Sequence, residues 1–182
     1  MTVPQNPTGF VVEVAEAAFL QPFREKHLQR PGVGMGPHVT ILSNFYAAEA
    51  LDDEVRAAVR TLFAGLEPLT FTLDELGRFP DPGVLYLEPT PTDELLRLHE
   101  AVIGEFSIEA SDPVFHLTLA GWHPGDLDRL EQEFREAYGD RVPIAAAVNK
   151  VTLYARIGNV WHRDSEYALG LVEPGTGEYH PA

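Results

Sequence analysis

Hydrophobic and polar residues follow two different periods along this chain. Residues 69–76 alternate apolar and polar side chains, which is typical of a strand with one buried face. Residues 51–64 instead place aliphatic side chains between charged ones at helical spacing. Such patterns predict helices at 15–28, 51–64, 92–106 and 126–138, strands at 9–14, 38–45, 69–76, 84–87, 142–148, 151–157 and 166–172, and a further strand that starts at His116.

Proline and glycine mark the ends of several of these elements. Pro22 removes a backbone donor from the middle of the expected helix 15–28, so this helix should be irregular there. Residues 29–37 are rich in glycine and proline and predict a loop that leads into the strand at His38. The sequence Pro80-Asp81-Pro82-Gly83 predicts a turn, so the strands on either side of it should form a hairpin.

The order of elements favours an α+β fold with largely antiparallel sheets. Strands cluster with helices, without the regular strand-helix-strand alternation of a parallel sheet. Each half of the chain reads as helix, loop, strand, helix and hairpin. We therefore expect a single domain over residues 1–182, with two pseudo-symmetric lobes at roughly 15–90 and 91–172 on either side of a central groove, and with terminal strands that could be exchanged between the lobes.

Two short segments repeat the same pattern of residue types. Residues 37–42 read Pro-His-Val-Thr-Ile-Leu and residues 115–120 read Phe-His-Leu-Thr-Leu-Ala, and their histidines are 78 positions apart. Because side chains alternate between the two faces of a strand, His38 lies on the same face as Thr40, and His116 lies on the same face as Thr118. If the two halves pack together, two imidazoles and two hydroxyls meet in one groove, which predicts metal-free acid-base chemistry on a phosphoester.

Each of these four residues has an expected role in opening a cyclic phosphate. An imidazole titrates near neutral pH, so one neutral and one protonated histidine can act together as base and acid. His38 and His116 would fill these two roles, and the sequence leaves open which of them is the base. Thr40 and Thr118 would each donate a hydrogen bond to a non-bridging phosphoryl oxygen.

The net charge of −15, from 28 acidic and 13 basic residues, argues against a protein that holds long nucleic acid. Such proteins need clustered Lys and Arg, whereas this chain has two lysines, Lys26 and Lys150, and its arginines are scattered. A small nucleotide or an RNA terminus is therefore the expected partner, with no cofactor. The absence of cysteine excludes disulfides, thiolate catalysis and cysteine-bound zinc.

The composition also bears on location. The apolar runs are too short to cross a bilayer, and residues 1–7 lack the basic start and apolar stretch of a secretory signal. We therefore expect a cytoplasmic protein without a membrane partner.

The two motifs, their separation and the hairpin Leu85-Tyr86-Leu87 between them make the chain resemble the 2H phosphoesterase superfamily, and specifically its 2′-5′ RNA ligase-like branch. The resemblance covers nearly the whole chain. It implies a bilobal α+β fold in which the motifs lie on facing central strands. It also implies a metal-independent activity on 2′,3′-cyclic phosphates or related RNA-end phosphoesters, with ligation as the reverse reaction.

Other residues are weaker candidates for the same groove. Tyr86 could stack on a base, and Arg156 could offer a bidentate fork to phosphate. The tryptophans are expected in the core or between the lobes. The histidines without a partner pattern are expected at the surface, and these are His27, His99, His162 and His180.

Two other functional classes stay open at this level. One is a protein that binds a nucleotide or an RNA end in the same groove without turning it over. The other is a zinc enzyme that uses His38 and His116, although catalytic zinc usually needs three protein ligands and no helical His pair or cysteine supplies the third. We therefore expect no metal.

Overall fold

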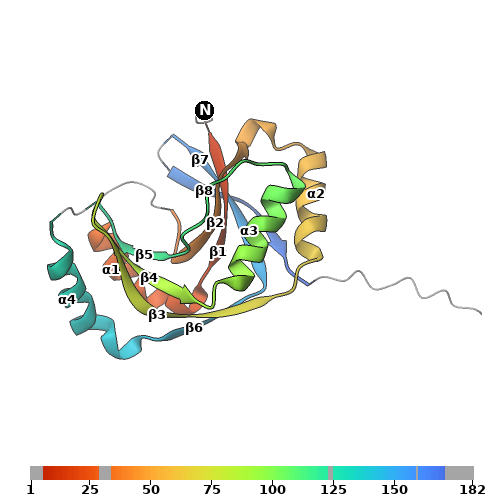
Figure 1. Cartoon of the computed structure of the whole chain (residues 1–182). Coiled ribbons are helices and arrows are strands. Elements are labelled where there is room, and N and C mark those ends of the chain that lie inside the picture. The colour runs from red at the N-terminus through yellow and green to blue at the C-terminus, as the bar shows by residue number, and fades with distance from the viewer. Residues whose placement is uncertain (1–5, 29–33, 123–124, 159, 171–182) are drawn as a thin grey trace, which may run out of the picture.

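The computed structural model describes residues 6–28, 34–122, 125–158 and 160–170, which form two four-stranded antiparallel sheets with helices packed against them (Figure 1). The predicted α+β class and the antiparallel sheets are confirmed. The first sheet has the strand order β2-β1-β7-β8, with β1 at Pro7–Glu13, β2 at His38–Ala47, β7 at Lys150–Ile157 and β8 at Val160–Ala168. The second has the order β5-β4-β3-β6, with β3 at Leu69–Phe79, β4 at Val84–Thr90, β5 at Leu117–Ala120 and β6 at Ile144–Val148.

Each sheet takes strands from both halves of the chain, so the lobes do not follow the sequential halves 15–90 and 91–172. Strands β1 and β2 pair with the C-terminal hairpin β7-β8, while the central hairpin β3-β4 pairs with β5 and β6. The apolar sequence of β1 explains its place inside the first sheet, because a strand that is buried on both faces needs continuous hydrophobic residues. The exchange of strands ties the two lobes into one folding unit.

The helices pack against the sheets in two pairs. Helices α2 (Asp53–Ala64) and α3 (Asp93–Glu105) pack against the first sheet at β8 and β2, respectively. Helices α1 (Gln21–His27) and α4 (Leu127–Tyr138) pack against the second sheet at β5 and β4. Three short 3₁₀ helices are also present in the described residues, η1 at Ala15–Leu20, η2 at Ala48–Ala50 and η3 at Gly139–Arg141.

Two predicted elements differ from the structure. The helix expected at 15–28 is divided into η1 and α1, because Pro22 lies in the first turn of α1, where its missing N–H breaks no helical hydrogen bond. The strand expected at 166–172 starts earlier, at Val160, and residues 171–172 lie outside the described part of the chain. The polar residues 162–166 hid this strand from the hydrophobic pattern, because β8 is an edge strand with largely exposed side chains.

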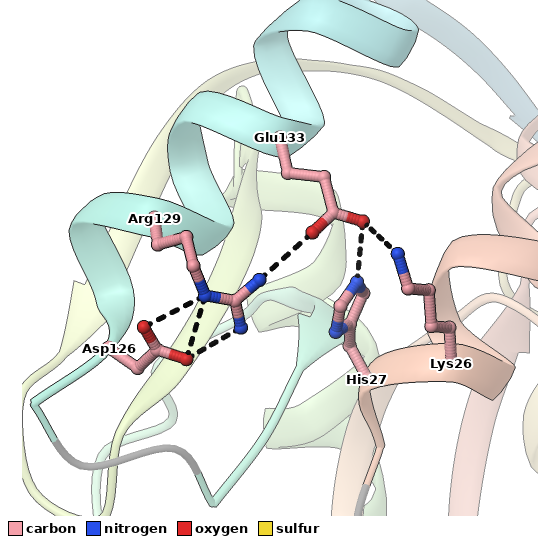
Figure 2. A network of polar contacts seen from close by, with 5 residues as sticks. All are labelled: Lys26, His27, Asp126, Arg129 and Glu133. Atoms are coloured by element: carbon pink, nitrogen blue, oxygen red, sulfur yellow. Dashed lines mark hydrogen bonds and ion pairs between the residues drawn. The ribbon is translucent and has the colours of Figure 1, made fainter.

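A network of charged side chains fixes α1 against α4 (Figure 2). Glu133 on α4 accepts hydrogen bonds from Lys26 at 2.6 Å and from His27 at 2.9 Å, and its other oxygen accepts one from Arg129 at 3.1 Å. The Lys26 and His27 side chains hold the pKa of Glu133 down to about 2, so this carboxylate is ionised at neutral pH. At the end of α1, the amide of Gly121 donates to the carbonyl of His27, which joins the helix to the end of β5.

Candidate active site

The two motif strands are edge strands of their sheets, and they contact each other where the sheets meet. The expectation that the motifs lie on central strands is therefore wrong with respect to hydrogen-bonding order. An edge strand has a neighbour on one side only, so its other side can border a groove. We call the region where β2 and β5 meet, at the junction of the two sheets, the groove.

Both motif histidines are oriented by the same local hydrogen bond. The Nδ1 atom of His38 lies 2.7 Å from the carbonyl oxygen of Gly36, and Nδ1 of His116 lies 2.7 Å from the carbonyl oxygen of Val114. A carbonyl oxygen only accepts, so Nδ1 carries the proton in both rings. In the neutral form of each imidazole, Nε2 is therefore the unprotonated nitrogen that can receive a proton from a ligand.

Thr40 lies beside His38 as the strand pattern predicts, whereas His116 directly precedes β5, which begins at Leu117. In the register of β1 and β2, His38 is opposite Glu13 and Thr40 is opposite Val11, so both motif side chains belong to the same face of the first sheet. On the other side of the groove, Thr118 is opposite Tyr86 in the second sheet. Both hydroxyl-bearing residues are partly buried.

The electrostatics of His38 place it near His116 and near a third residue, Arg24. The pKa of His38 is lowered to about 4, mainly because burial disfavours its charged form, and the positive charges of Arg24 and His116 lower it further. His38 is therefore neutral at physiological pH. The two motif histidines are therefore close enough for the charge of His116 to act on His38.

Arg24 is a site residue that the sequence interpretation missed. It is 3% exposed, and its Nε donates to the carbonyl oxygen of Thr118 at 2.9 Å while Nη1 donates to the carbonyl oxygen of Met35 at 3.3 Å. It thus joins β5 to the loop that precedes His38. Burial lowers its pKa to about 10, so it stays cationic at neutral pH. The signal for it was present, because Arg24 is four residues after the buried Leu20 and so falls on the apolar face of the helical segment.

Two aromatic rings surround His116. The centroids of Phe79 and Tyr86 each lie 5.2 Å from the centroid of the His116 ring. Gly77, opposite Tyr86 in the sheet, makes room for this arrangement, because a Cβ atom there would lie 2.1 Å from the Tyr86 ring. Tyr86, expected from the sequence to contact substrate, is therefore next to His116, and burial, with a smaller contribution from the charge of Glu88, raises its pKa.

Arg156 is not brought to the histidines in the same way. It lies on β7, opposite Trp161, and its guanidinium carbon is 5.9 Å from the centroid of the Trp161 ring. Its Nε is buried without a hydrogen-bond partner among the described residues. The strand pairing puts Arg156 on the same face of the first sheet as His38. The two residues are nevertheless separated, because β1 lies between β7 and β2, and Arg156 is level with the opposite end of β1 from His38.

Two histidines expected at the surface are buried. His27 and His99 are each 4% exposed, because His27 bonds to Glu133 and His99 bonds to the carbonyl oxygen of Ile41. His162 is exposed as expected, and His180 lies outside the described residues. The surface prediction for His27 and His99 was wrong because each ring bonds to a partner far away in sequence, which a local pattern does not show.

A cavity of about 650 Å³ adjoins the motif residues. Thr40 and His116 lie at its edge, the following residues of β2 line one side, and the segment that precedes His116 lines the other. Among the described residues, no group of three or more His, Cys, Asp or Glu side chains is placed to hold a metal ion. No helix in the described part of the chain is both long and apolar enough to cross a membrane.

Comparison with known proteins agrees with this geometry. A 90-residue stretch is 31% identical to a Bacillus licheniformis protein that is provisionally named a phosphoesterase, and the match covers 46% of this chain and 52%, about half, of that relative. The fold is similar to Escherichia coli LigT, with a TM-score of 0.57 and 21% identity over 91% of this chain and 98% of that one.

Two further solved structures share the fold. A crystallised phosphoesterase has a TM-score of 0.61 and 20% identity, over 91% of this chain and 99% of that one. A Thermus thermophilus protein, TT0787, has a TM-score of 0.59 and 19% identity, over 90% of this chain and 98% of that one. The model of the family described as the 2′-5′ RNA ligase superfamily matches residues 11–159, which confirms the resemblance carried by the two motifs. The chain therefore belongs to the 2′-5′ RNA ligase superfamily.

Proposed function

We propose that this protein is a phosphodiesterase that opens 2′,3′-cyclic phosphates of nucleotides or RNA termini with two histidines and no metal. One observation carries the proposal. His38 begins β2 and His116 directly precedes β5, and the two are close enough for the charge of His116 to act on His38. Both have Nδ1 bonded to the carbonyl two residues earlier, so Nε2 is the nitrogen of each ring that can exchange a proton with a ligand. Membership in the superfamily supports a phosphoesterase activity.

The surroundings of the histidines assign their roles in this proposal. His38 is neutral at physiological pH, so its Nε2 accepts a proton from the attacking water. The water oxygen bonds to phosphorus, and the bond from phosphorus to one ribose oxygen breaks. Protonated His116 gives its proton to that departing oxygen. His38 ends the step protonated and His116 neutral, so the two exchange their protons with solvent before the next cycle.

The hydroxyls and Arg24 complete the chemistry. Thr40 and Thr118 each donate to a non-bridging oxygen, whose charge grows as water attacks. Arg24 is a positioning residue, because it binds the backbone of Thr118 and lowers the pKa of His38 through its charge. The ligands crystallised with LigT are of the proposed chemical type, since they include phosphate and the ribose 3′-phosphate 3′-AMP.

The net charge supports a small or terminal substrate. With 28 acidic against 13 basic residues, the chain lacks the excess of cations that binding to a long phosphate backbone requires. A mononucleotide or a short oligonucleotide with one cyclic phosphate needs no such surface. The non-catalytic alternative, a protein that binds these ligands without turnover, uses the same groove and is separated from the proposal by the assay below.

The test is a panel of 2′,3′-cyclic nucleotides and short oligonucleotides that end in a cyclic phosphate, incubated with chelator. We expect hydrolysis by the wild type, with the 2′- or 3′-phosphate products resolved by chromatography. The double variant His38→Ala, His116→Ala should lose it, whereas His162→Ala, which removes an exposed histidine of β8, should not. Binding of nucleotides without hydrolysis would favour the non-catalytic alternative, and near wild-type hydrolysis by the double variant would refute the mechanism.

A further inference from the structure

The cavity beside His116 has a chemical character of its own. Glu109 and Asp112 line it from the segment before His116, together with the hydroxyl of Ser111, and Ser43 and Asn44 line it from β2. No Lys or Arg is among the described residues that line it. A phosphate site needs cations or several converging N–H donors, so this lining does not suit a second phosphoryl group.

His99 adds a buried acceptor to the same cavity. It belongs to α3, lines the cavity and is only 4% exposed. Its Nδ1 lies 2.8 Å from the carbonyl oxygen of Ile41, so Nδ1 carries the proton and Nε2 of the neutral ring has a lone pair. No described residue donates to that Nε2. The acceptors of a mostly buried side chain are usually satisfied, which points to a donor supplied by a ligand or by water in the cavity that His99 lines.

The Nε2 atom of His99 is also accessible from the cavity side. The described side-chain polar atoms that are both fully enclosed and without a partner are Thr152 Oγ1 and Arg156 Nε, and His99 Nε2 is not among them. Because His99 lines this cavity, the cavity is a space to which its Nε2 can open. The cavity thus combines this imidazole acceptor with two carboxylates a short way from the catalytic pair.

We infer that this cavity binds the uncharged, hydrogen-bond-donating part of the substrate, namely the nucleoside, and selects against a second phosphate. The inference rests on the proposed function, because it takes the scissile phosphate to lie between His38 and His116. Amino groups of a base or the free 5′-hydroxyl of the sugar match the acceptors His99, Glu109 and Asp112. A 5′-phosphate in the same space meets two carboxylates and no cation. The preferred substrate class is therefore nucleoside 2′,3′-cyclic monophosphates with a free 5′-hydroxyl.

The first arm of the test compares kcat/KM for adenosine 2′,3′-cyclic phosphate with and without a 5′-phosphate. We expect the wild type to prefer the 5′-hydroxyl form severalfold, because Glu109 and Asp112 repel a second anion while their exposure lets solvent screen part of that repulsion. In the double variant Glu109→Gln, Asp112→Asn, the ratio of kcat/KM for the 5′-hydroxyl form to kcat/KM for the 5′-phosphate form should be smaller. The matched control Glu100→Gln, Glu105→Gln removes the same charge from exposed positions of α3 outside the cavity and should leave the preference unchanged.

The second arm tests His99. His99→Asn keeps a side-chain N–H for the Ile41 carbonyl but removes the second acceptor, so KM should rise about tenfold with kcat little changed. Comparison of cytidine and 3-methyluridine substrates then shows whether His99 receives an N–H of the base, since only cytidine offers one. A loss confined to cytidine assigns the base to the cavity, and an equal loss assigns the sugar.

Calorimetric binding of 3′-AMP, with and without an added 5′-phosphate, separates failure of the inference from failure of the proposed function. If cyclic phosphates are not hydrolysed but 3′-AMP binds with the expected preference, the catalytic proposal fails and the inference about the cavity stands. The inference would be overturned if the wild type hydrolyses the cyclic phosphate, and binds 3′-AMP, equally well with and without a 5′-phosphate. It would also be overturned by a control double variant that narrows the preference as much as the cavity variant.

Discussion

The two sides of the groove carry the same motif but give their histidines different surroundings. At the start of β2, His38 is partly buried near the cationic Arg24, and its pKa is lowered to about 4. Directly before β5, His116 lies against the rings of Phe79 and Tyr86 and borders the acidic cavity. The comparison teaches that the same local hydrogen bond sets the tautomer of both imidazoles, whereas burial and the charge of Arg24, a residue outside the motif, set the protonation state of His38.

The largest expected effect comes from removing either imidazole. His38→Ala and His116→Ala should each lower kcat about two to four orders of magnitude, which is the usual contribution of one general acid or base. If the two sides differ as proposed, the residual activity of the His38 variant should lack the acidic limb of the pH profile, and that of the His116 variant should lack the alkaline limb. Identical residual profiles would contradict the division of roles.

Substitution of Arg24 tests why the pKa of His38 is lowered. Arg24→Met removes a positive charge near His38, so protonation of His38 becomes easier and its pKa should rise from about 4 toward the ordinary value of 6.5. Because kcat/KM reports the free enzyme, its acidic limb should move to higher pH. The rise should be partial, since burial is the larger cause of the lowered pKa.

Arg24→Lys is the matched control for this experiment. It keeps the charge but loses the fork that reaches the carbonyl oxygens of Thr118 and Met35. If charge sets the pKa, the acidic limb of the Lys variant should stay near that of the wild type while kcat falls. If the acidic limb of kcat/KM moves equally in Arg24→Met and Arg24→Lys, Arg24 acts on His38 by packing alone and not by its charge.

The motif threonines should give smaller effects. Thr40→Val and Thr118→Val each remove one donor to a charged oxygen, a contact worth about 1.5–3 kcal/mol, so kcat should fall roughly tenfold to a hundredfold. Thr61→Val, which removes an exposed hydroxyl of α2 that bonds within its own helix, is the control. A loss on only one side of the groove would show that the phosphate is held asymmetrically.

Much of this site could be predicted from residues that act locally. The strand period placed His38 beside Thr40, and the structure has this pair on one face of β2, whereas His116 lies one residue before β5 begins at Leu117. The turn at residues 80–83 gave the hairpin that carries Tyr86. These features depend on side-chain alternation and turn chemistry, which a short window of sequence contains.

What could not be predicted depends on contacts between distant segments. Arg24 and Thr118 are 94 positions apart, and His99 and Ile41 are 58 apart, so no local pattern announces either bond. The exchange of strands between the sheets has the same origin, because pairing of β1 with β7 joins the two ends of the chain. In the sequence, Glu109 and Asp112 look like ordinary surface charges, and only the fold shows that they line a cavity together with residues of β2.

The support of His116 by its aromatic neighbours can be tested through Gly77. In Gly77→Ala the new Cβ overlaps the Tyr86 ring and must push it from its place beside His116, so stability should fall by about 1–3 kcal/mol. Gly104→Ala is the control, because a Cβ there meets nothing within 4 Å and alanine favours the helix. Chemical denaturation measures both. Stability of Gly77→Ala equal to the wild type would show that Tyr86 is not held where His116 needs it.

The smallest expected effect concerns the network that holds α1, the helix of Arg24. Glu133 has its pKa lowered to about 2 by Lys26 and His27, so its contribution to stability is complete above the unfolded value near 4.5 and is lost as pH falls through 2. Glu133→Gln should lower Tm by about 1–3 °C at pH 7, because partly exposed ion pairs contribute little, and the difference from wild type should shrink toward pH 2. Glu136→Gln, on the same helix, is the control. If Glu133→Gln also moves the acidic limb of kcat/KM, the helix transmits its position to His38 through Arg24, and the two sides of the groove are coupled through α1.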